Sequence, residues 1–329
     1  MSDTIQAGAL RRATLEYLPV SLFGSVMGLT GLSAAWHLGA ARYGMPNGIG
    51  DAIGVAAVAT FLVLVVAYGV KLVSAPASVL AEFRHPVAGA LFGTLLISLL
   101  LLPIVLAPVN LRLAQGLWVL GAVGMVLFAW TIVNRWMSDR QQIAHATPAW
   151  IVPVVGLLDL PLAIPVLQLP PIGGVSMFAL SVGLFFAVPL FTVVFGRLLF
   201  EPPMPDAQKP SLLILLAPFA VGFSCYTVTI GRADLFAEAL YMLSLFMFAV
   251  LAGRLRELGQ CCPFRVSWWA VGFPLAATTI AALRYAELHP NLATDGIALV
   301  LLAVTTILLA GLAVRTLLGI VRGELRNLV

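Results

Sequence analysis

Long uninterrupted runs of apolar residues divide this chain of 329 residues, and they constrain its fold more than any other feature. Each run reaches about 20 residues, the length that crosses the hydrocarbon layer of a bilayer as a helix. Hydrophobic residues make up 61% of the chain and charged residues only 10%, whereas a soluble domain carries about 25% charged residues. Because backbone in lipid must satisfy its hydrogen bonds internally, and the runs do not alternate as barrel strands do, we expect an all-α integral membrane protein.

Ten such runs are separated by short loops rich in glycine, proline and charge, which are turn-forming residues. No segment is long enough or polar enough to form a second domain. We therefore expect a single transmembrane domain over 1–329. Its expected spans are 17–38, 50–73, 87–108, 113–133, 148–168, 172–200, 211–231, 234–253, 267–286 and 294–318.

The basic residues are distributed unevenly between the two sides of the membrane that ten spans define. Fourteen of them, including Arg11 and Arg12, fall on the side of the N-terminus, and only four fall on the other side. This positive-inside signal predicts a bacterial inner-membrane protein with both termini in the cytoplasm. The net charge of +4 does not indicate a nucleic-acid partner, because the basic residues occur singly or in pairs in short loops.

Prolines are concentrated in alternate spans. A proline inside a helix removes a hydrogen bond and bends the helix, so the freed carbonyl needs a partner in protein or water. We interpret the pattern as five helical hairpins, each with one bent inner helix beside a central cavity and one straight outer helix facing lipid. The alternative is that prolines are simply commoner in membrane helices. The odd-numbered spans contain Pro19, Pro103, Pro153, Pro161, Pro218 and Pro274, and among the even-numbered spans only the sixth has an internal proline, Pro189.

Small residues in the first span follow a similar logic. Gly24, Gly28 and Gly31 have the spacing that lets two helix backbones approach closely. Tight packing without a pore explains the same glycines, so they do not separate the two interpretations.

Four segments, in order along the chain, resemble the tellurite-resistance protein TehA family, which includes the plant slow-type anion channels and the C4-dicarboxylate (malic acid) transporters. The total length and the spacing of the segments agree as well. The segments are 19–36, beginning Pro-Val-Ser-Leu-Phe-Gly and ending Ala-Ala-Trp; 82–87, Glu-Phe-Arg-His-Pro-Val; 216–223, Leu-Ala-Pro-Phe-Ala-Val-Gly-Phe; and 268–274, Trp-Trp-Ala-Val-Gly-Phe-Pro.

The resemblance implies five hairpins in a quasi-fivefold arrangement, a homotrimer, and one pore per protomer lined by the odd-numbered helices. It also implies that a phenylalanine of the ninth helix plugs the pore midway, and Phe273 occupies the matching position. Phe223, in the segment that resembles the seventh helix, is a further pore-lining candidate.

The expected pore contains no lysine or arginine in the middle of any span. Its attractions for anions are then the basic cytoplasmic mouth, helix N-termini near the prolines, and hydroxyl groups. Such weak binding suits passage, because a conducted ion must also leave. Alternatively, each hydroxyl bonds its own backbone four residues back. The hydroxyl candidates are Ser21, Ser25, Thr94, Ser224 and Thr227.

Asp159 lies near the centre of the fifth span, where a carboxyl group is a functional candidate. If ionised, it would repel anions from a narrow pore. If protonated through burial, it could donate a hydrogen bond to a bound carboxylate or carry a proton. A structural role is equally open, in which Asp159 satisfies backbone groups that Pro161 or Pro165 leaves free.

These features predict a gated channel for small inorganic anions, occluded by Phe273. The alternative is a secondary carrier for C4-dicarboxylates or for oxyanions such as tellurite, coupled to protons through Asp159. We expect no enzyme, because the chain has no Ser-His-Asp set, no paired carboxylates in one span and no nucleotide-binding loop. We also expect no cofactor and no metal, since no two histidines have metal-ligand spacing on one helix face.

Overall fold

The structure is a computed structural model that describes residues 15–170, 172–261 and 264–328. Arg11 and Arg12, counted above as cytoplasmic, lie outside the described residues. Within the described ranges the regular secondary structure is helical and includes no strand. This confirms the all-α expectation, and the helices begin and end within about two turns of the expected spans.

Five units of the chain, here called the inner units, combine 3-10 segments with α-helices. Prolines occur in or beside each of them, and because proline lacks an N–H group, it interrupts the hydrogen-bond ladder of a regular α-helix. In chain order the units are η1 Val20–Leu22 with α2 Phe23–Tyr43; η2 Ala88–Phe92 with α5 Gly93–Leu106; η4 Pro148–Ile151, α7 Val152–Val155, η5 Gly156–Ala163 and α8 Ile164–Leu167; η6 Asp206–Leu216 with α10 Ala217–Ile230; and η7 Val266–Val271 with α12 Gly272–Leu288.

Five long α-helices, here called the outer helices, follow the inner units one by one along the chain. They are uninterrupted by 3-10 segments, although α9 contains Pro189. The outer helices are α3 Asn47–Ser74, α6 Leu111–Ser138, α9 Gly173–Phe200, α11 Leu235–Cys261 and α13 Leu292–Val321; the short elements are α4 Pro76–Arg84, η3 Ile143–His145 and α14 Leu325–Leu328.

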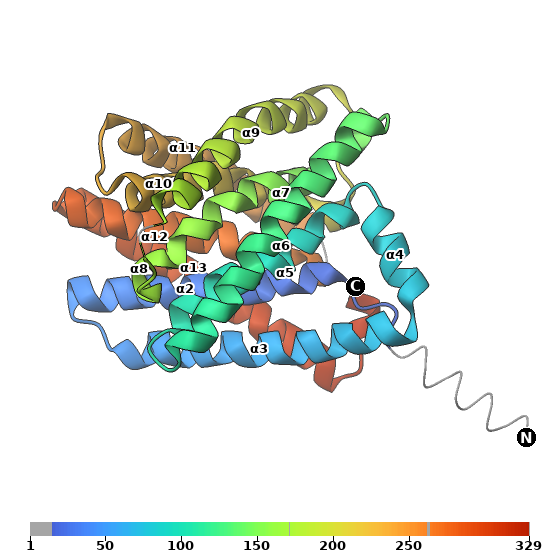
Figure 1. Ribbon diagram of the computed structural model, residues 1–329, viewed down its shortest axis with the longest axis horizontal. Helices are drawn as coiled ribbons and strands as arrows, with labels where there is room; N and C mark the ends of the chain where they lie inside the picture. Colours follow the sequence, from blue (N-terminus) through green and yellow to red (C-terminus); the bar gives the residue numbers. More distant parts are fainter. Residues whose placement is uncertain (1–14, 171, 262–263, 329) are drawn as a thin grey trace, which may run out of the picture.

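The inner units form two closed rings of contacts. In the first, here called the 3-10 ring, η1 contacts η2, η2 contacts η4, η4 contacts η6, η6 contacts η7, and η7 contacts η1. In the second, here called the α ring, α2, α5, η5, α10 and α12 contact one another in that order, and α12 contacts α2. Helices from the two ends of the chain therefore lie side by side, as α2 and α12 do in Figure 1.

The outer helices surround these rings. Each outer helix packs against an inner unit that precedes it, and the membrane-length windows of the outer helices are 28–39% buried. The corresponding windows of the inner units are 61–78% buried. Among the described residues, nine helical units are long and apolar enough to cross a membrane. The unit η1–α2 falls outside that set because it carries serine, threonine, histidine and glycine, and it lies among other helices rather than in lipid.

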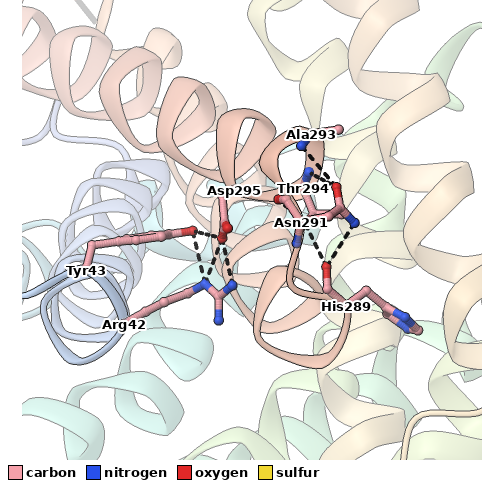
Figure 2. Close-up of polar contacts among 7 residues, drawn as sticks. All are labelled: Arg42, Tyr43, His289, Asn291, Ala293, Thr294 and Asp295. Atoms are coloured by element: carbon pink, nitrogen blue, oxygen red, sulfur yellow. Dashed lines mark hydrogen bonds and ion pairs between the residues drawn. The ribbon is translucent and has the colours of Figure 1, made fainter.

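A polar clasp joins the end of α2 to the start of α13 (Figure 2). Arg42 donates from Nε and Nη2 to Oδ1 of Asp295 at 2.9 and 2.7 Å, and the hydroxyl of Tyr43 donates to the same oxygen at 2.8 Å. Asn291 caps α13 by accepting from the N–H groups of Ala293 and Thr294. The clasp fixes the first inner unit to the last outer helix.

A second polar cluster holds the start of the first inner unit. Oε1 of Glu82 accepts from the N–H of Val20 at 2.7 Å, and Oε2 accepts from Lys71 Nζ at 2.7 Å and from the Tyr68 hydroxyl at 3.0 Å. Lys71, only 3% exposed, also donates to the carbonyl of Leu18 at 2.7 Å. The cluster ties α3 and α4 to the beginning of η1.

A central cavity as candidate functional site

A cavity lies inside the rings and is lined by residues from all five inner units. The space that the centres of water molecules can reach is about 140 Å³. A single water needs about 10–15 Å³ of such space, so the cavity accommodates several waters or a small, partly hydrated ion. The last lining residue along each inner unit is Met27, Ile97, Asp159, Val221 or Pro274, so the cavity occupies the 3-10 ring and the first turns of the α ring.

The wall of the cavity is largely apolar. Its polar side chains include those of Ser21, Thr94, Thr147 and Ser211, and its one carboxyl group among the described residues is that of Asp159. No lysine or arginine occurs among the described residues that line it. An anion entering the cavity therefore meets dipoles and apolar surface instead of a fixed cation.

Several of the expected hydroxyl groups are engaged by their own helices. Ser25 donates to the carbonyl of Leu22 at 2.7 Å, and Thr94 donates to that of Leu91 at 2.7 Å. Both bonds reach three residues back, not the four that we expected. The reason is local geometry, because each acceptor belongs to a 3-10 segment, in which carbonyls face groups three residues ahead. The hydroxyl of Thr227 also donates three residues back, to the carbonyl of Ser224 at 3.0 Å.

Phe273 forms part of the cavity wall at the point where η7 becomes α12. Its side chain is buried, with 6% of the residue exposed. The ring lies close to the backbone of α2 at Gly31, where a Cβ atom would stand 3.6 Å from Phe273 Cδ2 and 2.8 Å from Ala276 Cβ. The missing side chain of Gly31 thus makes room for Ala276 of α12, and the Phe273 ring would lie at an ordinary contact distance from a Cβ atom there.

Asp159 lies in η5, lines the cavity, and is 2% exposed. Its Oδ1 atom is buried and has no hydrogen-bond partner among the described residues. The structural role considered above required a bond to backbone freed by Pro161 or Pro165, and the described contacts include no such bond. A buried polar atom without a partner is costly, which favours a role in binding.

The other candidates divide into two groups. Gly24 and Pro274 line the cavity with Phe273 and Asp159. Gly28 faces Gly272 across the contact between α2 and α12, where an added Cβ would lie 3.2 Å from Gly272 Cα. The remaining prolines break or begin the inner units without lining the cavity: Pro19, Pro103, Pro153, Pro161 and Pro218.

Phe223 was expected near the pore, but its side chain is absent from the described cavity wall. It is fully buried and packs against Tyr241 of α11, with ring centroids 5.9 Å apart. Sequence reasoning also missed Thr147 and Trp269, which do line the cavity. Both occur at the starts of inner units, and the 3-10 ring that brings those starts together is not visible in a hydropathy pattern.

Comparison with known proteins agrees with this architecture. An S-type anion channel of Arabidopsis thaliana, SLAH3, is 26% identical over 313 residues, which cover 91% of this chain and 48% of that protein. The tellurite resistance protein TehA homolog of Haemophilus influenzae is 24% identical over 316 residues, covering 93% of this chain and 92% of that protein. An uncharacterized transporter of Methanocaldococcus jannaschii, MJ0762, is 29% identical over 238 residues, covering 65% and 69%.

Two of these relatives are named as an anion channel and as a transporter, and the third, named for tellurite resistance, matches along nearly its whole length. The family described as voltage-dependent anion channels, SLAC1, matches residues 17–317, which include all ten expected spans except the last residue of the tenth. The chain is a multi-pass membrane protein and belongs to the SLAC1 family of voltage-dependent anion channels.

Proposed function

We propose that the protein is a gated channel for small inorganic anions and that the ring of Phe273 occludes its pore. The observation that carries the proposal is the cavity inside two closed rings, with a buried aromatic side chain in its wall. Opening then requires the ring to move away from Gly31, and the path would continue between the second halves of α2, α5, α10 and α12.

The chemistry of the wall supports passage over capture. Hydroxyl and backbone dipoles attract an anion weakly, so it can leave again, whereas a buried fixed cation would hold it. Selectivity in such a pore follows the cost of dehydration. We therefore expect nitrate to permeate more readily than chloride, and a strong preference for chloride in reversal potentials would contradict this.

The decisive experiment measures anion current through the purified protein in planar bilayers. Phe273→Ala should raise the passive current at least tenfold. Phe223→Ala is the matched control, because Phe223 is also a buried phenylalanine at an inner unit but packs on Tyr241, away from the cavity. Both variants lose packing energy, about 3–5 kcal/mol for a buried phenylalanine. A comparable rise in both would indicate leakage through a destabilised bundle and would overturn the occlusion.

A second function, carriage of C4-dicarboxylates or oxyanions coupled to protons, is favoured by Asp159. Its unpartnered oxygen belongs to a residue of the cavity wall, where it could meet a substrate carboxylate. Liposomes with the protein reconstituted in their membrane should then accumulate dicarboxylate under an inward proton gradient. In Asp159→Asn, uptake should no longer depend on the gradient. Unchanged transport by Asp159→Asn at every pH tested would remove the carrier from consideration.

Assembly and orientation belong to the same proposal. We infer a homotrimer in the bacterial inner membrane with both termini in the cytoplasm, as the family resemblance and the distribution of basic residues imply. Light scattering of the detergent complex tests the trimer. Protease protection of terminal tags in sealed spheroplasts tests the orientation.

A further inference from the structure

Arg197 is a buried cation with no anionic partner among the described residues. It lies in the last turns of the outer helix α9 and is 5% exposed. Its Nε and Nη1 atoms have no hydrogen-bond partner among the described residues. The described ion pairs do not include it either. A guanidinium group remains charged in proteins, so its burial without compensation is strongly unfavourable.

The depth of Arg197 follows from the packing of α9 on the third inner unit. Gly183 of α9 faces Leu158 of η5, where an added Cβ would meet the leucine side chain. From Gly183 to Arg197 the helix rises about 21 Å, at about 1.5 Å per residue. Along the third inner unit, a rise of about 21 Å from Leu158 back toward the N-terminus, through η5 and α7, reaches the start of η4. The third inner unit and α9 run antiparallel, and α9 contacts both η3 and η4. Arg197 therefore lies level with the segment that joins η3 to η4.

Thr147 occupies that joining segment. It is 3% exposed, and its hydroxyl oxygen has no hydrogen-bond partner among the described residues. Thr147 also lines the central cavity. Two buried polar groups without partners thus lie at one level of the molecule, on neighbouring elements, at the end where the 3-10 ring begins.

We propose that Arg197 and Thr147 form an oxyanion-binding site beside the mouth of the cavity, separate from Phe273 and Asp159. A guanidinium group offers several N–H donors in a plane and a threonine adds a hydroxyl donor, so an anion with two or more oxygens satisfies both residues together. Chloride presents a single centre and meets this arrangement less well. The ligand is either a soluble oxyanion or the phosphate of a lipid headgroup, and the two share the chemistry that the site recognises. The site does not depend on the proposed gate.

The test measures the melting temperature of the full-length protein, purified in detergent and delipidated, in increasing sodium phosphate or sodium nitrate. Sodium chloride at equal ionic strength is the reference. With increasing phosphate or nitrate, the melting temperature of the wild type should rise to saturation and should exceed the melting temperature in chloride. Arg197→Gln should weaken the apparent affinity at least tenfold, and Thr147→Val should weaken it less. Arg135→Gln is the control and should leave the response intact, because Arg135 already has a partner within the protein. It donates to the carbonyl of Phe83 at 2.8 Å.

Native mass spectrometry of protein that has not been delipidated distinguishes the sources. A phospholipid retained by the wild type and by Arg135→Gln, but lost from Arg197→Gln, assigns the site to a headgroup phosphate. If neither soluble oxyanion nor phospholipid depends on Arg197, the proposal is overturned. Should Arg197→Gln fail to fold, Arg197→Lys serves instead: it keeps the charge but offers fewer donors, so it should bind more weakly. Wild-type affinity in Arg197→Lys would also overturn the site.

Discussion

The inner units and the outer helices of this bundle are built from similar apolar residues, yet they differ in burial, in regularity and in their contacts. The inner units are mostly buried, begin with 3-10 segments and meet in closed rings. The outer helices are largely exposed and run without such interruption for 27 to 30 residues. Proline explains much of the difference, because it interrupts the hydrogen-bond ladder of an α-helix, and an interrupted backbone is tolerated in a membrane only where protein or a cavity satisfies it.

Glycines show the contrast at single positions. An added Cβ at Gly28 of α2 would press on the backbone of Gly272, whereas at Gly311 of the outer helix α13 it would meet open space. In the inner rings glycine sets the distance between helices. Outer-helix glycines that face an inner unit are also close-packed, as Gly183 is against Leu158, whereas Gly311 meets open space. A glycine is therefore required where two helix backbones converge, because a larger side chain has no room there.

The largest effect on stability is expected where the outer layer is tied to the inner rings. Glu82→Ala removes the acceptor of the buried Lys71 and of the Val20 N–H group. Leaving one member of a buried ion pair unmatched costs about 3–5 kcal/mol. Thermal or denaturant unfolding in detergent measures the loss. The double variant Lys71→Met with Glu82→Gln should lose less than Glu82→Ala; a greater loss would mean that the pair itself, and not the uncompensated charge, governs stability.

A smaller effect is expected from Gly28→Val, compared with Gly311→Val. The valine at position 28 must push α2 away from α12, and overpacking of this kind costs about 1–3 kcal/mol. At position 311 the same side chain enters open space, so the melting temperature should change little. Gly24→Ala provides a graded control, because its nearest contact would be an ordinary 3.7 Å to the carbonyl oxygen of Trp269. Equal losses at positions 28 and 311 would remove the distinction between a glycine at a helix contact and one that faces open space.

The smallest effect is expected at the clasp between α2 and α13. Asp295→Asn retains an acceptor for the Tyr43 hydroxyl but removes the charge that pairs with Arg42. Because both side chains are partly exposed, the decrease in melting temperature should be slight, and high salt should reduce it further. A decrease as large as that of Gly28→Val would show that the clasp governs the closure of the bundle.

Much of this architecture could be predicted from residues alone. The spans follow from apolar length, and the separation into inner and outer helices follows from prolines such as Pro153, Pro161 and Pro218. The position of Asp159 in the fifth span was also predictable. Hydropathy, however, did not reveal that Phe223 packs on Tyr241 or that Thr147 reaches the cavity. Those facts depend on which face of an interrupted helix turns inward, and a 3-10 segment changes the angle between successive side chains.

The sequence by itself determined that this protein lies in a lipid bilayer, that it is helical, and that interrupted and continuous helices alternate. Burial in lipid and the chemistry of proline act locally along the chain, so both can be read from the residues. Only the tertiary structure decided that the inner units close into two rings, that Phe273 lies beside Gly31, and that two nitrogen atoms of Arg197 are buried without a partner among the described residues. These features join residues far apart in the chain. Their energies come from contacts and missing contacts that exist only after the helices have packed.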